Sequence, residues 1–346
     1  MQRTGVAAYD ALNWYPFSDE PIIHSLWYMP RLCDPAFILP DVAGDNQWHL
    51  FAHTWVGLEH FISSNGLDWD PQGMVELRGN SPFLFNKSGI WYLLYEKHDA
   101  TPSNFNWKKL RSRKAWGERN SRIEMRSTKD FIVFSEPITL LSSKDVPFAK
   151  DMLDDPRLSR PQLFFDEQHG FSLFFGASHL TMEDTHQKAS LYFALARASR
   201  LEGPYTLQGS GPLLGPDPDD PYRNMAVGSI KVVPSQEGYV GFECAFGWDK
   251  HQSRTVSSLI QIESTDGLSW HRSDRKPLFV TPKEGWASRY ITGCDVCYKP
   301  DDYCHYCYYS ADALIKKGPF TVVRESIGLL LGKDPQPRQV FPPSTT

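Results

Sequence analysis

Apolar residues along this chain come in short runs that are separated by polar turns. Two such runs with a turn between them form a recurring unit, and this arrangement is typical of a β-hairpin. Copies of the unit occupy residues 34–52, 81–95, 160–175, 229–243 and 294–307. The second run of a copy is often rich in aromatic residues, as in the segment from Trp91 to Tyr95. Since the runs are too short for stable helices, the pattern predicts strands.

A turn motif follows each predicted hairpin. The segment Ser63-Ser64-Asn65-Gly66-Leu67-Asp68-Trp69 recurs as Ser264-Thr265-Asp266-Gly267-Leu268-Ser269-Trp270, and residues 127–134 are a third version. Two further copies, at 201–205 and 316–320, carry Gly-Pro-aromatic instead. Five turns, spaced by roughly 65 residues, indicate five structural units.

Antiparallel sheets that repeat in this way stack radially, so we expect an all-β fold, the five-bladed β-propeller. A β-sandwich would not repeat the same module five times. We expect a single domain over residues 1–346, with blades at about 28–73, 79–140, 158–209, 224–279 and 289–330. Residues 1–27 and the tail after Gly332 are expected to wrap around the propeller, because four prolines in the tail argue against a strand there.

Composition and charge narrow the range of partners. Hydrophobic residues make up 41% of the 346 residues, which is enough for a large core. The formal net charge of -5 gives no basic face, so nucleic acid and anionic membranes are not expected partners, and a neutral or weakly polar ligand fits better. Residues 1–8 lack the apolar core of a signal peptide. We therefore expect a cytoplasmic protein, or a secreted one if a leader has been removed.

The six cysteines raise the question of a metal or disulfides. Cys294 and Cys297 form one Cys-x-x-Cys pair, and Cys304 and Cys307 form another. A tight hairpin between them would set Cys297 opposite Cys304 and Cys294 opposite Cys307, with residues three apart on opposite faces of a strand. Four sulfurs would then not converge on one tetrahedral metal. We expect buried thiols, with cross-strand disulfides and zinc as alternatives, and no cofactor.

The turn motifs and the Asp34-Pro35 start of the first blade resemble the five-bladed propeller glycoside hydrolases and related sugar-active proteins. These include the arabinanase/xylosidase, invertase/levansucrase and mannoside phosphorylase groups. The resemblance covers residues 27–325 and implies a carbohydrate in the central pocket. Glycosidic hydrolysis needs one carboxylic acid and a second carboxylate. By resemblance, Asp34 is the general base or nucleophile, with a structural cap as the alternative.

Glu243 is the candidate for the general acid. Glu243-Cys244 looks like the Glu-Cys pair of the invertase-like group, in which the glutamate is the acid. A glutamate inside an apolar strand is also costly to bury unless it is paired or functional, which marks the same residue. An arginine-paired structural glutamate is the alternative.

Two positions depart from the pattern of these enzymes. Residues 224–229, where the arabinanase-type enzymes place a glutamate on blade four, contain no carboxylate. Arg160 precedes Pro161 where the family has an aspartate on blade three. Arg160 could bind an acidic group of the substrate, orient the catalytic acids, or form a salt bridge at a blade junction. Asp154 and Asp155 could supply the missing charge, or lie in a solvated loop.

Polar and aromatic residues around the channel complete the candidate site. The predicted substrate-binding residues are Trp27, His53, Glu96, Arg160, Trp248, Arg289 and Asp295. His53 and Glu96 follow the second strands of blades one and two, where sugar hydroxyls would be within reach. The tryptophans would stack on the apolar face of a sugar ring, unless they fill space between blades.

These observations predict a glycosidase that acts on a small or terminal sugar, with furanosides among the candidates and Asp34 and Glu243 as the working pair. The arabinanase-like group inverts and the invertase-like group retains. A separation of about 5 Å between the two carboxylates would indicate retention, and one of about 6.5 to 9.5 Å would indicate inversion. A non-catalytic carbohydrate-recognition propeller is one alternative. A glycoside phosphorylase or transferase is another, in which Arg160 and Arg289 would hold an anion.

Overall fold

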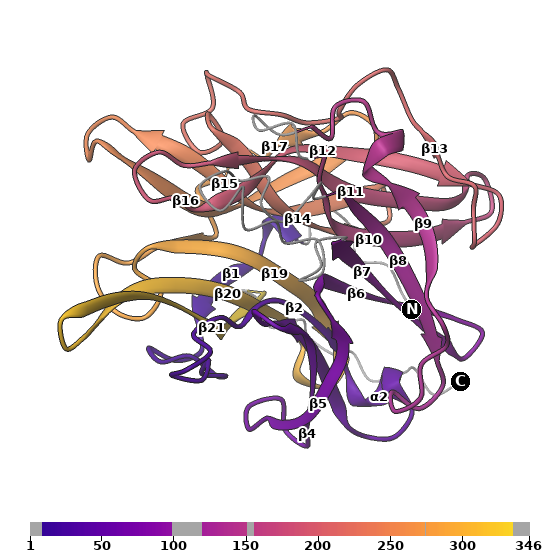
Figure 1. Ribbon diagram of the computed structural model, residues 1–346, viewed down its shortest axis with the longest axis horizontal. Helices are drawn as coiled ribbons and strands as arrows, with labels where there is room; N and C mark the ends of the chain where they lie inside the picture. The colour runs from indigo at the N-terminus through magenta and orange to yellow at the C-terminus, as the bar shows by residue number, and fades with distance from the viewer. Residues whose placement is uncertain (1–8, 99–119, 151–155, 274, 335–346) are drawn as a thin grey trace, which may run out of the picture.

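The computed structural model describes residues 9–98, 120–150, 156–273 and 275–334. Its strands form five antiparallel blades that follow one another in a ring (Figure 1). The first sheet contains β2 (Cys33–Ile38), β3 (Trp48–His53), β4 (Gly57–Ser63) and β5 (Asp70–Leu77). The second contains β6 (Gly79–Lys87), β7 (Ile90–His98), β8 (Ser121–Thr128) and β9 (Ile138–Ser142).

The next two blades are joined by one residue pair, Ser190 with Gly228. Blade three contains β10 (Leu158–Asp166), β11 (Gly170–Thr181), β12 (Lys188–Ala198) and β13 (Thr206–Leu207). Blade four contains β14 (Ala226–Pro234), β15 (Tyr239–Asp249), β16 (Arg254–Ser264), β17 (His271–Arg272) and β18 (Phe279–Val280). The described helical segments are the helix α2 (Pro40–Ala43) and the 3-10 turns η4 (Ser143–Asp145) and η5 (Pro300–Asp302).

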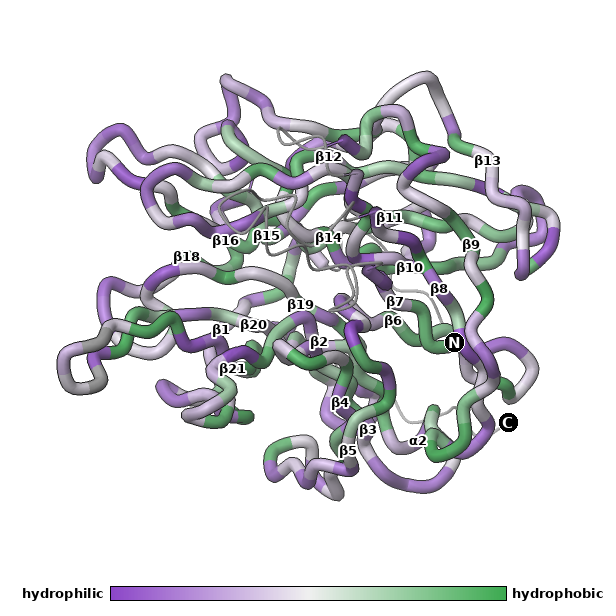
Figure 2. Tube along the Cα trace, in the orientation of Figure 1, coloured by the Kyte–Doolittle hydropathy of each residue, from purple (hydrophilic) through white to green (hydrophobic). Residues whose placement is uncertain are grey.

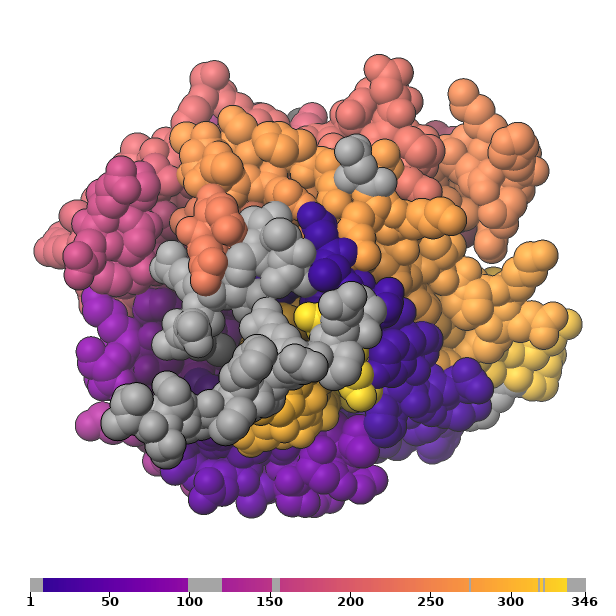
Figure 3. Space-filling view, turned by 180° about the vertical axis from the view of Figure 1, so that it is seen from behind, coloured from indigo at the N-terminus to yellow at the C-terminus, as the bar shows by residue number. Residues whose placement is uncertain are grey.

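Blade five is assembled from both ends of the chain. It contains β19 (Tyr290–Lys299), β20 (Cys304–Lys317) and β21 (Phe320–Lys333), and its outermost strand is β1 (Asn13–Pro16), which pairs with β21. Part of the segment that was expected only to wrap around the propeller is therefore a strand. In Figure 3 this N-terminal segment lies against blade five. The tail beyond residue 334 lies outside the described residues.

The five innermost strands close into a ring. Each of β2, β6, β10 and β14 contacts the next innermost strand, and β19 contacts β2. Each junction between neighbouring blades has its own apolar cluster, for example Phe51 with Leu93 between blades one and two, and Phe37 with Tyr308 between blades five and one. Polar residues gather in the peripheral turns (Figure 2). The predicted five-bladed propeller is confirmed.

Local hydrogen bonds explain the repeated turns. Ser63 Oγ accepts from the Gly66 amide at 2.9 Å, and Trp69 Nε1 donates to the Gly66 carbonyl at 3.1 Å. The corresponding bonds of Ser264 and Trp270 to Gly267 have the same lengths. Both glycines have φ near 75°, a conformation that glycine adopts at little cost. These turns lead into the outer strand of their blades.

The Gly318 turn was interpreted wrongly as the fifth copy of this motif. It joins β20 to β21, the second and third strands of blade five, rather than the third and fourth. The reason is the assembly of the blade: because β1 supplies the fourth strand, blade five needs no turn at that place.

Candidate active site

Each innermost strand begins with an irregularity that faces the channel. In β2, β6 and β10 the pairing register shifts at Asp34-Pro35, Ser81-Pro82 and Arg160-Pro161. The residues before the three prolines have φ of 49° to 51°, a strained conformation for a residue with a side chain. Bulges of this kind re-aim side chains, and they are common beside active sites. Asp34, Ser81 and Arg160 are thereby brought to one pocket.

The pocket lies on the axis of the propeller and measures about 40 Å³. All five innermost strands contribute to it: its lining includes Asp34, Ser81, Phe83, Arg160, Gln162, Ser229, Lys231, Gly293 and Asp295. A volume of this size admits water-sized groups beside Asp34 but not a whole sugar ring. A sugar would therefore approach Asp34 from the mouth of the channel.

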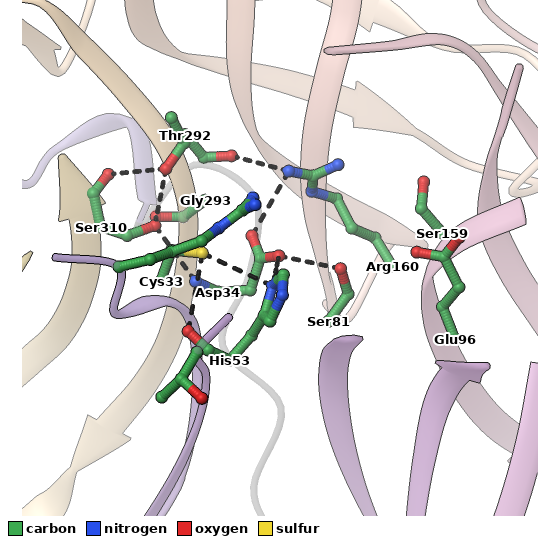
Figure 4. A network of polar contacts seen from close by, with 12 residues as sticks. Cys33, Asp34, His53, Ser81, Glu96, Ser159, Arg160, Thr292, Gly293 and Ser310 are labelled. Carbon is green, nitrogen blue, oxygen red and sulfur yellow. Dashed lines mark hydrogen bonds and ion pairs between the residues drawn. The ribbon is translucent and has the colours of Figure 1, made fainter. Parts of the chain in front are cut away.

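Asp34 is the centre of the polar network in Figure 4. Ser81 Oγ donates to Asp34 Oδ2 at 2.8 Å, and Arg160 Nη2 donates to Oδ1 at 3.3 Å. The backbone amide of Asp34 donates to Ser310 Oγ at 3.2 Å, and His53 Nδ1 lies 3.6 Å from Oδ2. Burial alone would raise the pKa of Asp34, but the charge of Arg160 and the hydrogen bonds hold it well below its usual range. Asp34 is thus ionised at neutral pH.

Arg160 connects three blades through its guanidinium group. Besides Asp34 of blade one, Nη2 donates to the Thr292 carbonyl of blade five at 3.2 Å, and Nη1 donates to Ser190 Oγ of blade three at 3.2 Å. Its Nε is buried and has no hydrogen-bond partner among the described residues. The side chain stands across the channel from Asp34, where it neutralises and orients that carboxylate.

Glu96 carries a second carboxylate near the channel, from blade two. Arg157 Nε donates to Glu96 Oε1 at 2.9 Å, and His98 Nε2 lies 3.3 Å from the same oxygen. Burial opposes ionisation, but the charges of Arg157 and His98 outweigh it and lower the pKa of Glu96. Within the described ranges the polar contacts of the Glu96 side chain fall on Oε1. The side chain is 3% exposed, and Glu96 does not line the channel pocket. Figure 4 shows Glu96 beyond Arg160 from Asp34.

Glu243 lies elsewhere, in β15 on the side of blade four that faces blade three. Its side chain is 0% exposed, and Arg223 Nη1 donates to Oε2 at 3.1 Å. Burial raises the pKa of Glu243 to about 8, against the opposing charge of Arg223. Glu243 does not line the channel pocket. The contact with Arg223 is the one expected of a structural glutamate paired with an arginine. The role of Glu243 as the general acid stays a prediction.

Asp295 also lines the pocket. Its Oδ1 forms an ion pair with Lys231 Nζ at 2.5 Å, and its Oδ2 accepts from the Phe37 amide at 2.8 Å. Lys231 also lies over the Phe83 ring, with Nζ 4.7 Å from the centroid. Burial would lower the pKa of Lys231, but Asp295 outweighs it and raises the value. The pair connects blades four and five, and a contact of Asp295 with substrate stays a prediction.

The remaining predicted substrate-binding residues lie further out. Arg289 Nη1 donates to Asp312 Oδ2 at 2.6 Å, and burial raises the pKa of this aspartate to about 7. Trp27 precedes β2 and is 71% exposed. Trp248 is 38% exposed and lines a different cavity of about 640 Å³ on blade four. Asp154 and Asp155 lie outside the described residues.

Two contributors to the network were missed in the sequence. Ser81 precedes Pro82 just as Asp34 precedes Pro35, so the blade alignment itself could have identified it. Arg157 pairs with a glutamate 61 positions earlier, and no local pattern indicates that contact.

The hairpin of blade five pairs its cysteines differently from the expectation. Cys297 lies opposite Tyr306 and Cys294 opposite Tyr309, so the predicted pairs, Cys297 with Cys304 and Cys294 with Cys307, are wrong. The reason is the position of the turn: η5 and Tyr303, in a left-handed conformation, close the hairpin with Lys299 opposite Cys304, which shifts the register by two residues. All six cysteines are free thiols.

No family model and no curated protein sequence matches the chain. Solved structures do match it. A BT0996 RGII complex is 14% identical, with coverage of 98% of this chain and 97% of the other and a TM-score of 0.64. A glycoside hydrolase is 15% identical, with the same coverage and a TM-score of 0.63. The GH43 endo-arabinanase from Bacillus licheniformis is 13% identical, with coverage of 87% and 94% and a TM-score of 0.50.

At these identities the similarity shows the fold. The chain has the five-bladed β-propeller fold of glycoside hydrolases such as those of families 43, 117 and 32. Within the described residues, no helix is long and apolar enough to cross a membrane.

Proposed function

We propose that this protein hydrolyses a glycosidic bond at the mouth of the channel, with Asp34 as the carboxylate that activates water or attacks the sugar. The observation that carries the proposal is the environment of Asp34. The carboxylate lines the pocket, and Arg160 and Ser81 keep it oriented and lower its pKa. An ionised, fixed carboxylate at an open pocket is what a base or nucleophile of this chemistry requires.

Glu96 is the better candidate for the second carboxylate. It comes from the blade next to Asp34, and Oε2 has no partner in the described part of the chain. Both glutamates are buried, with side-chain exposures of 3% for Glu96 and 0% for Glu243, but the pKa of Glu96 is lowered and that of Glu243 is raised. Because Arg157 and His98 lower the pKa of Glu96, proton donation from Glu96 would require acidic conditions. We therefore infer that substrates with good leaving groups are cleaved best at neutral pH.

A small or terminal sugar suits the mouth of the channel. The pocket beside Asp34 is too small for a whole ring, so one hydroxyl or the anomeric centre would enter it. Trp55, 63% exposed in the turn between β3 and β4, lies just beyond His53. An exposed indole can cover the apolar face of a sugar ring. The proposed substrates include furanosides.

The test is product formation from aryl furanosides, aryl pyranosides and short oligosaccharides, with and without phosphate. We expect turnover by the wild type, and its loss in Asp34→Asn. Asp45→Asn is the matched control, because Asp45 contacts His49 at the periphery and not the pocket. Turnover that survives in Asp34→Asn would refute the proposed role, and turnover that depends on phosphate would identify a phosphorylase.

A carbohydrate-recognition propeller is the second candidate. It is favoured by one observation: Asp34 and Glu96 are both paired with arginines and held ionised, so neither is a ready proton donor at neutral pH. Sugar binding by calorimetry, without turnover of any glycoside, would support this candidate over hydrolysis.

A further inference from the structure

Three potential metal ligands meet at the start of blade one. His53 Nδ1 lies 3.6 Å from Cys33 Sγ and 3.6 Å from Asp34 Oδ2. Within the described ranges, this is the one group of three or more cysteine, histidine or acidic residues whose ligand atoms all lie within 4.8 Å of one another. Cys33 is 2% exposed and His53 is 7% exposed. The group is therefore buried and compact.

The bulge in β2 explains how these side chains meet. Consecutive residues of a regular strand point to opposite faces, so Cys33 and Asp34 should diverge. The φ of 51° at Asp34 and the register shift after Cys33 turn both toward the neighbouring strand. There His53 is the direct cross-strand partner of Cys33. The backbone thus preorganises three donors that a regular hairpin would separate.

The spacing fits a tetrahedral ion. With Zn–S of about 2.3 Å and Zn–N and Zn–O of about 2.0 Å, the edges of a tetrahedral site are about 3.5 Å for N···S and about 3.3 Å for N···O. The two observed separations of 3.6 Å are close to these values. The third separation, between Cys33 Sγ and the Asp34 carboxylate, is within 4.8 Å, so side-chain rotation rather than movement of the strands would complete the site.

We propose that Cys33, Asp34 and His53 form a zinc site. A thiolate and an imidazole select zinc over magnesium or calcium, which prefer oxygen ligands. Three protein ligands leave a fourth position open, as in zinc sites that bind water or a substrate. Because Asp34 lines the channel pocket, that position is supplied by water or by a sugar hydroxyl.

The surrounding charges are compatible with a dication. Arg160 and Ser81 hold Asp34, and such outer-shell contacts orient metal ligands. Arg31 lies close to Cys33, and Glu325 Oε2 lies 3.0 Å from its Nε. On binding, the Cys33 thiol releases its proton to solvent. The thiolate, the Asp34 carboxylate and the dication together then carry no net charge beside the two arginines.

Zinc binding itself does not depend on the proposed hydrolysis, but one consequence does. A metal on Oδ2 withdraws Asp34 from its role as a base or nucleophile. If the proposed function holds, zinc inhibits turnover reversibly, and a chelator restores it.

The test uses Co²⁺ as a spectroscopic substitute for zinc in metal-free protein. We expect one equivalent of bound metal, the visible bands of four-coordinate cobalt, and a thiolate-to-cobalt charge-transfer band. Cys33→Ser should lose the charge-transfer band. Both Cys33→Ser and His53→Gln should lose more zinc affinity than the roughly 10- to 100-fold typical of outer-shell changes. Cys297→Ser, on blade five, is the matched control and should keep both signals.

Thermal unfolding of the metal-free variants shows whether each is folded. If Cys33→Ser is unfolded, His53→Gln carries the test, because it leaves the thiol in place. Less than one equivalent of bound metal in the wild type, or a charge-transfer band that persists in Cys33→Ser, would overturn the site. The metal stoichiometry and the cobalt spectra are measured without substrate. They therefore test the zinc site even if the protein hydrolyses no glycoside.

Discussion

Arg160 Nη2 lies 3.3 Å from Asp34 Oδ1, so a cation from blade three faces the carboxylate of blade one across the channel. Both residues stand at the same position of their innermost strands, each before a proline and each with positive φ. The position that carries a carboxylate on blade one thus carries a guanidinium group on blade three, and the two side chains attract each other.

This relationship predicts the effect of Arg160→Gln. The charge of Arg160 lowers the pKa of Asp34, so its removal should let Asp34 take up a proton at higher pH. We expect the pKa of Asp34, followed by carboxyl NMR titration, to rise by about 1 to 3 pH units. The acid limb of kcat/KM should move upward with it, because a base acts only when ionised.

Ser190→Ala is the control for Arg160→Gln, because it removes the hydrogen bond to Nη1 and leaves the guanidinium charge in place. It should leave the titration of Asp34 nearly unchanged. An unchanged titration in Arg160→Gln would instead favour a role of Arg160 in binding an acidic group of the substrate.

A second prediction concerns Glu96→Gln and the leaving group. If Glu96 donates the proton to the departing oxygen, its loss should slow the cleavage of alkyl glycosides and oligosaccharides by about 10²- to 10⁴-fold. Dinitrophenyl glycosides need no protonation and should be affected little. Steady-state kinetics on both substrate types measure the difference. Equal losses on both would assign Glu96 to binding rather than to proton transfer.

The outer turns of the first four blades were predictable because their hydrogen bonds are local, whereas the fifth turn, at Gly318, joins a different pair of strands. Ser63, Gly66 and Trp69 bond to one another within seven residues, and the same chemistry recurs 201 positions later at Ser264. The strand β1 was not predictable in this way. It has four residues, ends in Pro16, and pairs with a strand more than 300 residues away, so no turn of its own marks it.

The candidate site was predictable only in part, for a physical reason. A residue before proline at the start of an innermost strand faces the channel whatever its type, so Asp34 and Arg160 could be placed from the repeat. The place of Glu243 could not be predicted, because β15 packs against a neighbouring blade on each of its faces. Burial alone does not show which residue pairs with a glutamate there. The partner is Arg223, 20 positions earlier in the chain, which donates a hydrogen bond to Glu243.

The burial of Glu243 leads to a third prediction, on stability. Its pKa is about 8 in the folded protein against 4.5 for an ordinary glutamate. Between these values the unfolded chain releases the proton and the folded chain keeps it. The stabilising contribution is therefore complete below pH 4.5 and is lost as the pH rises toward 8, with a slope of up to about 1.4 kcal/mol per pH unit.

Glu243→Gln should flatten this dependence, because the amide does not titrate. Urea unfolding at several pH values between 4.5 and 8 measures it. The pKa of Asp312 is also raised, so Asp312 adds a pH dependence of the same sign to the stability of both the wild type and Glu243→Gln. Glu136→Gln, at an exposed position, is the control and should follow the wild type. If wild type and Glu243→Gln keep parallel profiles, Glu243 is ionised in its pair with Arg223.

The fourth prediction tests the contact between β1 and β21, which joins the two ends of the chain in blade five. Trp14 of β1 lies opposite Gly332 of β21, and a Cβ at Gly332 would come within 2.9 Å of the Trp14 ring. Alanine is intrinsically favoured over glycine in a strand, so any loss must come from this contact. We expect Gly332→Ala to lower the free energy of unfolding by about 1 to 3 kcal/mol, measured by urea titration.

Gly211→Ala is the matched control for Gly332→Ala, because an added Cβ at Gly211 meets nothing within 4 Å among the described residues. The double variant Trp14→Ala with Gly332→Ala separates the contact from other effects. Removal of the indole abolishes the clash, so the two losses should be less than additive. Full additivity would mean that Trp14 does not rest on Gly332 in solution, and the last blade would then have to be closed by contacts other than those of β1.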